Sequence, residues 1–340
     1  MTWFVVDAVG ESFKRTRKCL LEPFNLMKWF KLAIIVALAG GGGSSGYNGS
    51  TSDYQTSELP HLPFFDPANG NRFLDPITTM SDLPIIIAII GSILLLILIF
   101  WYISSVMDFV LVESVTKNEV RLREYTRKYM RVGLNLFVIR LVLAIGFFAI
   151  FAMAALPMIL QIINDPSGNL WPMLIAGGLS LVAIILMISI FSSIIYSFIY
   201  LCIPIAMYDQ VGIIEALEKV VATFRQDWKQ MIGYWAGRFL LWAGGGVAFG
   251  ILVLAIILIP GLLFLLIDGI IYFILSEILQ QSIIWLVLAP FAIIEIVLLI
   301  LLSIMAIMPL HIFMKYHMLV FLKKWRPLTT IPFFEITDEN

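Results

Sequence analysis

Six long apolar stretches, separated by segments that differ sharply in their content of basic residues, constrain the fold of this chain most strongly. Of its 22 Lys and Arg residues, Arg140 and Arg238 lie within apolar stretches, and only Arg72 lies in a segment that we place outside the cell. The others fall in four segments that alternate with the outer loops. Because Lys and Arg accumulate in cytoplasmic loops, this pattern predicts a polytopic membrane protein with both termini in the cytoplasm.

The composition indicates that lipid is the solvent for most of the chain. Its 340 residues are 61% hydrophobic and 13% charged, which is more apolar surface than a soluble domain of this length can bury. The net charge of −1 gives no signal for nucleic-acid binding. Cys19 and Cys202 both map to the cytoplasmic side, where we expect free thiols. We therefore predict an all-α protein of the cell (plasma) membrane, with the loop 44–82 extracellular.

Hydrophobic periodicity places the remaining elements. Residues 2–22 and 211–231 are predicted to be amphipathic helices that form a collar at the cytoplasmic ends of the spans, because their apolar residues recur at helical spacing. Pro260 is expected to end the fifth span. The following segment 261–279 is then either an outer interfacial helix or a re-entrant half-helix. The six predicted transmembrane helices cover residues 25–43, 83–113, 134–162, 172–208, 232–259 and 283–318, with a connector at 114–133 and a tight outer turn at 164–171.

An aromatic residue flanked by polar or basic residues recurs about every 100 residues. Trp29, Tyr129 and Trp228 stand at equivalent places, and Trp325 belongs to a truncated fourth copy. Aromatic rings suit the headgroup level of a bilayer, so these four residues are predicted interfacial anchors. The period predicts one membrane domain, 1–340, built of three parallel hairpin repeats and a cytoplasmic tail. The repeats span residues 2–113, 114–208 and 209–320, and the tail spans 321–340.

The run from Pro23 to Ala33, Pro-Phe-Asn-Leu-Met-Lys-Trp-Phe-Lys-Leu-Ala, followed by the four glycines at 40–43, resembles an uncharacterised family of archaeal integral membrane proteins. The six-span plan is also similar to the membrane domains attached to some glycerophosphodiester phosphodiesterases. The resemblance implies a membrane location and an archaeal source but no activity. The phosphodiesterase barrel and its metal carboxylates have no counterpart in this sequence.

Ionisable residues inside the apolar stretches are the sharpest functional candidates, because a charge in the bilayer must be neutralised, paired or hydrated. Glu295 falls about 18 Å from the outer end of its predicted span. Arg140 and Arg238 are its candidate partners, and we hypothesise that Glu295 bonds Arg238. Asp268 is a further intramembrane candidate. A structural ion pair, a transport or ligand site, and a lipid-facing protonated acid are the three interpretations of Glu295.

Two further features have a structural and a functional interpretation. Gly246 and Gly250 form a small-xxx-small pair, which favours close helix packing over a gating hinge. Asn48 begins an Asn-Gly-Ser triplet in the predicted outer loop and is a candidate glycosylation acceptor.

The sequence predicts no catalytic residue, metal site or cofactor. Residues 42–46 satisfy the Gly-x-Ser-x-Gly pattern of serine hydrolases, but that nucleophile requires a strand-to-helix turn. His311 and His317 are six residues apart, a spacing that does not place two imidazoles on one helical face.

Three functional classes follow. The leading one is a non-enzymatic membrane protein that binds or moves lipid or another amphiphile, or supports a membrane assembly. Its expected partners are anionic headgroups at the cytoplasmic face. It can be a homo- or hetero-oligomer. The basic segment 117–131 fits headgroup binding but equally serves to fix orientation. The alternative is a transporter or channel for a small ion or solute that uses Glu295 with Arg140 or Arg238. An intramembrane enzyme has the least support. A polar path to Glu295 would favour transport, and lipid-filled lateral grooves would favour the leading class.

Overall fold

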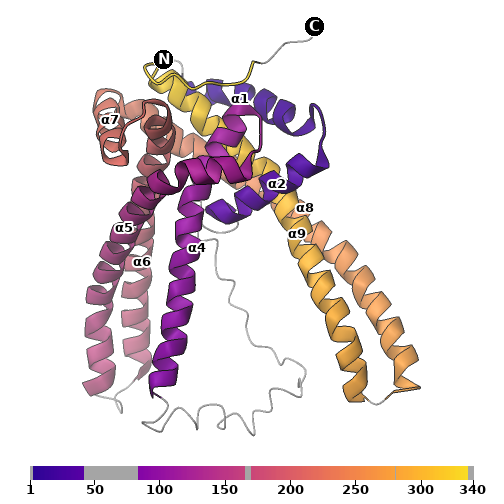
Figure 1. Cartoon of the computed structure of the whole chain (residues 1–340). Helices are drawn as coiled ribbons and strands as arrows, with labels where there is room; N and C mark the ends of the chain where they lie inside the picture. Colours follow the sequence, from indigo (N-terminus) through magenta and orange to yellow (C-terminus); the bar gives the residue numbers. More distant parts are fainter. Residues whose placement is uncertain (1–2, 42–82, 165–169, 280, 336–340) are drawn as a thin grey trace.

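The computed structural model describes residues 3–41, 83–164, 170–279 and 281–335, and these residues are helical apart from short connections (Figure 1). Five of the described helices contain segments long and apolar enough to cross a membrane. The chain is therefore an all-helical, multi-pass membrane protein over the residues described. In chain order the elements are α1 (Phe4–Leu21), α2 (Leu26–Val36), the π-helical η1 (Ala37–Gly41), α4 (Leu83–Lys117), α5 (Leu122–Asn164), α6 (Leu170–Tyr208), α7 (Ile213–Gln226), α8 (Trp228–Ser276) and α9 (Gln281–Trp325).

The five long helices exceed the length that a membrane requires. They contain 35 to 49 residues, whereas about 20 residues cross the hydrocarbon core. The surplus lies at one end of the molecule, where the helices meet in a shared hydrophobic core (Figure 1). We call this the converging end. Its core is built mainly from 106–115 of α4, 199–206 of α6 and 308–322 of α9.

Short helices and the C-terminal segment close the converging end. Helix α1 packs against α8 and α9, and α7 packs against α6. The buried face of α1 has helical spacing and consists of Val5, Ala8, Ser12, Arg15, Thr16, Cys19 and Leu20. Arg15 donates to the Phe334 carbonyl at 3.1 Å, and the Phe334 amide donates to the Thr116 carbonyl at 3.0 Å. The N-terminal helix and the C-terminal segment therefore lie at the same end of the molecule.

Away from this core the long helices separate into two groups. Figure 1 shows α4, α5 and α6 running together, while the α8–α9 hairpin diverges from them. Residues 87–97 of α4 are all exposed, which covers every face of three helical turns. Side chains on these turns are apolar apart from Ser92. Within the described chain this part of α4 has no protein cover, so lipid must surround it in a membrane.

The prediction that Pro260 ends the fifth span is wrong. Helix α8 continues through Pro260 to Ser276, so most of the segment 261–279 is neither an interfacial nor a re-entrant helix but the last turns of α8. Membrane helices tolerate proline because local adjustments satisfy the freed carbonyl. The hairpin between α8 and α9 consequently lies farther from the converging end than the sequence predicts.

The other predicted spans differ mainly in length. The connector predicted at 114–133 is largely helical, because α4 continues to Lys117 and α5 already begins at Leu122. Helix α9 likewise continues past 318 to Trp325. Glu, Lys and Arg are good helix formers, so a basic segment next to a span extends it instead of forming a loop.

The predicted first span corresponds to α2 and η1, which are short. The Asn25 side chain caps α2 by accepting hydrogen bonds from the amides of Met27 and Lys28. Helix α2 has 11 residues, about 16 Å at 1.5 Å per residue. Gly40 has φ 84°, a conformation that favours glycine, and it ends the regular helix. The predicted loop 44–82, with Asn48, lies outside the described residues, as does most of the turn at 164–171.

Candidate functional site: a charge cluster where the helices converge

Asp108 is the centre of a buried charge cluster that joins three long helices. Its Oδ2 accepts from Arg140 Nη2 of α5 at 2.7 Å, and its Oδ1 accepts from Lys315 Nζ of α9 at 2.8 Å. The side chains of Asp108, Arg140 and Lys315 are 2%, 5% and 15% exposed. The Tyr200 ring of α6 lies 5.5 Å from the Arg140 guanidinium and 5.0 Å from the Lys315 ammonium. Four helices thus contribute to one site.

The cluster contains more positive than negative charge. Burying an ion is costly unless an opposite charge and hydrogen bonds compensate for the lost water. Here one carboxylate serves two cations, and Arg140 gains only a long 3.3 Å hydrogen bond to Ser105. The Nε of Arg140 is buried without a partner among the described residues. The site therefore favours a further negative charge.

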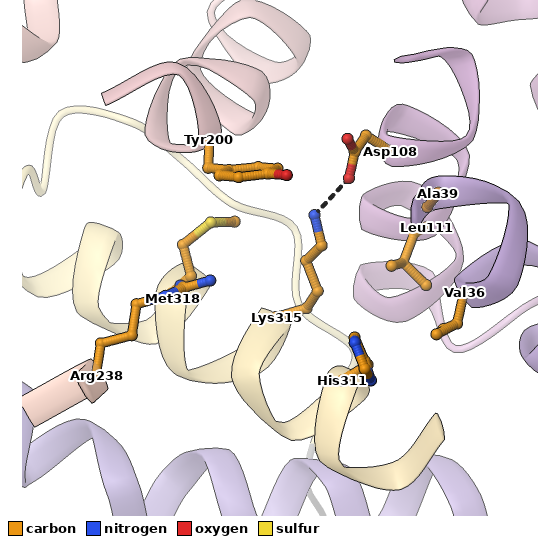
Figure 2. A pocket seen from close by; sticks show the side chains of 9 residues that line it. All are labelled: Val36, Ala39, Asp108, Leu111, Tyr200, Arg238, His311, Lys315 and Met318. Atoms are coloured by element: carbon orange, nitrogen blue, oxygen red, sulfur yellow. Dashed lines mark hydrogen bonds and ion pairs between the residues drawn. The ribbon is translucent and has the colours of Figure 1, made fainter. Parts of the chain in front are cut away.

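A pocket lies beside the cluster (Figure 2). It encloses about 30 Å³, which is room for one or two water molecules. Asp108 and Lys315 reach it from the cluster, Arg238 from α8 and His311 from α9. The rest of the wall is formed by Val36 of α2, Ala39 of η1, Leu111, Tyr200 and Met318.

Arg238 adds a third cation near the pocket. Its guanidinium donates to the Tyr234 hydroxyl at 2.7 Å and lies 5.8 Å from the centre of that ring. Within the described part of the chain, no carboxylate lies within 4.0 Å of it; the ion pairs found there do not include Arg238. Asp108 is the one carboxylate among the described residues that line the pocket, and it is paired with Arg140 and Lys315. The charge of Arg238 is therefore not compensated there and is suited to an anion.

The hypothesised bond between Glu295 and Arg238 is not formed. Glu295 lies instead beside Asp268 of α8, close enough for the two carboxyl groups to interact. Arg238 and Asp268 are about 45 Å apart along α8 at 1.5 Å per residue. The depth of Glu295 was counted correctly from the outer end of its own span, since α9 begins at Gln281. The partner was wrong because the fifth span was predicted to end at 259, whereas α8 continues to Ser276 and brings Asp268 to Glu295. Of the four intramembrane candidates, Arg238 lines the pocket, Arg140 is paired with Asp108 of its wall, and Glu295 and Asp268 lie far from it.

The predicted interfacial anchors have different environments. Trp228 is 50% exposed, as a ring at a lipid interface requires. Trp29 is partly buried and donates to the Leu20 carbonyl at 2.7 Å. Tyr129 and Trp325 are each only 6% exposed, so their rings contact protein. The recurring aromatic motif therefore marks core positions of the converging end as well as its surface.

The glycines chosen for helix packing are not at close contacts. A Cβ added at Gly246 or Gly250 would meet no atom within 4 Å. Close approach occurs instead at other glycines. A Cβ on Gly133 would lie 3.0 Å from the Val106 backbone, and one on Gly237 would lie 2.5 Å from a Val5 methyl group. The glycine pattern marks small residues but does not show which helix face meets a neighbour.

A second buried carboxylate, Glu113, ties α4 to α5. It accepts from Lys117 at 2.7 Å, from Lys128 at 3.0 Å and from the Tyr129 hydroxyl at 2.6 Å. Three donors, two of them cations, stabilise this carboxylate, so we interpret the group as a structural link. The described residues contain no group of three or more His, Cys, Asp or Glu side chains placed to hold a metal ion.

Sequence comparison assigns the chain to a family without assigning a function. No curated protein and no solved structure matches it. A family model described as a family of unknown function, DUF7544, matches residues 3–330 and so includes every helix of the converging end. The chain therefore belongs to the family of unknown function DUF7544.

Proposed function

We propose that this protein is a non-enzymatic membrane protein that binds anionic lipid where its helices converge. The observation that carries the proposal is Arg238, a cation that lines the pocket and has no carboxylate neighbour in the described chain. Phosphate oxygens accept paired hydrogen bonds from guanidinium groups, and such charge-assisted bonds are the strong ones. A lipid phosphate beside Arg238 would also offset the excess charge of Arg140 and Lys315.

Lipid chains can approach the converging end along the exposed part of α4. The turns of α4 at 87–97 are exposed on all sides, and the α8–α9 hairpin diverges from α4 (Figure 1). Chains that lie against these apolar surfaces lead toward the converging end. An exposed apolar environment, not a polar path, also surrounds the Glu295 region, where Ile293, Ile294 and Ile296 are exposed. These features support lipid binding over solute transport.

The depth of the cluster supports the same proposal. A crossing of about 20 residues, counted from the diverging ends of α4 and α5, ends near residues 103 and 144. Asp108 and Arg140 follow within about two turns, at the level where headgroups begin. The pocket is thus placed to receive a headgroup, not an acyl chain.

The topology that we propose has six crossings, with both termini in the cytoplasm of a cell-membrane protein. Five long helices cross five times, yet α1 and the segment 331–335 lie at the same end. An odd number of crossings would separate them, so our topology includes the sixth crossing that the sequence predicts at 25–43. This count fits three parallel in–out–in repeats, with α1 and α7 as interfacial helices at the cytoplasmic face. The basic residues of that face would meet anionic headgroups.

The transport alternative depends on Glu295 working with Arg140 or Arg238. Arg238 lines the pocket and Arg140 is bonded to Asp108 of its wall, whereas Glu295 lies beside Asp268 near the other end of the hairpin. No contact among the described residues links the pocket to the Glu295–Asp268 pair, so we do not propose the transport function.

Native mass spectrometry of the full chain in detergent, titrated with phosphatidylglycerol or phosphatidylcholine, tests the proposal. We expect tighter binding of the anionic lipid, and a loss of about tenfold in Arg238→Gln, because a hydrogen bond to a charged group contributes ~1.5–3 kcal/mol. Arg225→Gln is the matched control, since this exposed residue of α7 carries the same charge away from the pocket. Equal binding of both lipids, or equal losses in both variants, would overturn the proposal.

A further inference from the structure

Lys315 connects the two groups into which the long helices separate. It belongs to α9, and its Nζ donates to Asp108 Oδ1 of α4 at 2.8 Å. One other ion pair in the described part of the chain joins the two groups, and it is a longer contact of 3.6 Å between Arg326 and Asp209, which follow α9 and α6. Away from the converging end the groups diverge (Figure 1). Lys315 and Asp108 therefore form the ionic link between the groups at the pocket.

Asp108 keeps a counter-charge without Lys315. Its Oδ2 accepts from Arg140 of α5 at 2.7 Å, and α4 and α5 run in the same group (Figure 1). If Lys315 left, Asp108 and Arg140 would remain a buried pair with one charge of each sign. Breaking a buried ion pair is costly because it leaves one charge uncompensated. The cost of releasing Lys315 therefore falls on Lys315 itself, and an anion that bonds Lys315 would remove that cost.

A phosphate group does not fit the pocket in its observed form. The volume of about 30 Å³ holds one or two water molecules, whereas a phosphate has four oxygens around its phosphorus. The carboxylate of Asp108 also lines the wall, and it would repel a second anion at contact distance. Lys315 and Arg238 line the pocket from α9 and α8, whereas Asp108 lines it from α4 (Figure 2). Entry of a phosphate between them therefore requires α4 and α9 to move apart.

We propose that an anionic headgroup opens this link by exchanging partners with Asp108. The phosphate binds Lys315 and Arg238, Asp108 retains Arg140, and the α8–α9 hairpin moves away from α4. Before the exchange one carboxylate serves two cations, whereas afterwards the carboxylate and the phosphate each have their own. A ligand that bonds Lys315 only in the open form shifts the equilibrium toward that form. This exchange rests on the proposed function, because it requires an anionic lipid at Arg238, and it adds a change of conformation that ligand binding drives.

The distance between spin labels on the two helix groups measures the opening. Ile93 of α4 and Ile300 of α9 are both exposed, and they precede Asp108 and Lys315 by the same number of residues, about 22 Å toward the diverging ends. Nitroxides at these two positions of the full chain would be measured by pulsed electron paramagnetic resonance in bilayers of phosphatidylcholine and of an equal mixture with phosphatidylglycerol. In the mixture we expect the mean distance to increase by at least about 3 Å, because an oxygen bound to Lys315 takes up one hydrogen-bond length between Lys315 and Asp108.

Two variants should hold the molecule at opposite ends of this change. Lys315→Met removes the link, so the distance should already be long in phosphatidylcholine. Arg238→Gln keeps the link and removes a phosphate ligand, so the distance should stay short in both bilayers. Lys229→Met removes an exposed cation of α8 and, as the control, should respond like the wild type.

The outcomes separate this exchange from the proposed function. If the wild-type distance does not change although native mass spectrometry shows tighter binding of phosphatidylglycerol than of phosphatidylcholine, the exchange is refuted and the proposed function stands. If phosphatidylglycerol does not bind more tightly, both fail. Should Lys315→Met not fold, Arg238→Gln still decides, since an increase in distance that persists in this variant would overturn the role of the phosphate.

Discussion

Replacing Asp108 with Asn tests the buried charge cluster, because the change keeps the shape of the side chain and removes its charge. In wild type, Arg140 and Lys315 each contact one Asp108 oxygen, at 2.7 and 2.8 Å. Neither cation has another carboxylate within 4.0 Å in the described part of the chain. The substitution Asp108→Asn would therefore leave two cations near each other without a counter-charge.

The cost follows from burial. Removing one partner of a buried ion pair destabilises a protein by ~3–5 kcal/mol. Arg140 is 5% exposed and must bear the full penalty, whereas Lys315 is 15% exposed and can recover part of its hydration. We expect a total of about 4 kcal/mol. The equilibrium constant for unfolding would then increase by about a thousandfold, since 1.4 kcal/mol is a factor of ten.

Reversible unfolding of the full chain in mixed micelles, with denaturing detergent as the variable, measures this free energy. Glu119→Gln is the control, because Glu119 forms an exposed pair with Arg121 and its loss should change little. Adding Lys315→Met to Asp108→Asn should restore about 1–2 kcal/mol, because it removes one of the stranded charges. A loss below about 1 kcal/mol for Asp108→Asn would refute the reasoning, since it would mean that water already stabilises both cations.

The remaining predictions concern packing. Gly133→Ala should destabilise the fold by about 1–3 kcal/mol in a thermal unfolding assay, because the new Cβ would meet the Val106 backbone at 3.0 Å. Gly246→Ala should be neutral, because that Cβ would meet nothing within 4 Å; equal effects would contradict the observed packing. Cys19 should resist maleimide labelling until the protein is unfolded, because it lies on the buried face of α1 and burial raises the pKa of its thiol. Labelling should stay slow as the pH rises toward the ordinary thiol value of 9.0, because maleimide reacts with the thiolate; fast labelling of folded protein would exclude the docked α1.

The long helices were predictable because membrane spans have a strong local signature. A run of about 20 apolar residues specifies a helix whatever its neighbours are. Predictions from residue type alone failed where the environment of a residue determines whether the helix continues. Pro260 breaks a helix in water but not α8, and the basic residues after Lys117 were assigned to a loop although α5 begins at Leu122. The stripe at 211–231 located a helix correctly, but the chain turns at Asp227 and restarts as α8.

The site was predictable only as separate residues. Arg140 and Arg238 were visible as charges inside apolar stretches, whereas Asp108 and Lys315, which lie in the predicted spans 83–113 and 283–318, were not among the predicted site residues. Their association depends on how four helices meet, which no spacing along one helix encodes. Glu295 was assigned the wrong partner for the same reason, because an error in one hairpin end shifted its neighbours on α8. The sequence considered His311 only as a metal ligand and rejected it, because its place in the pocket wall is a property of tertiary packing.

Oxygen accessibility along the exposed turns of α4 determines whether lipid surrounds this helix and leads to the pocket at the converging end. A nitroxide label would be placed in turn at each position from 87 to 97 in the full chain reconstituted in bilayers, and its collision rate with oxygen would be measured. We predict high collision rates at every position, with only a smooth dependence on depth. A dip that recurs every three to four residues would show that protein covers one face of α4, and would rule out access of lipid to the pocket along this helix.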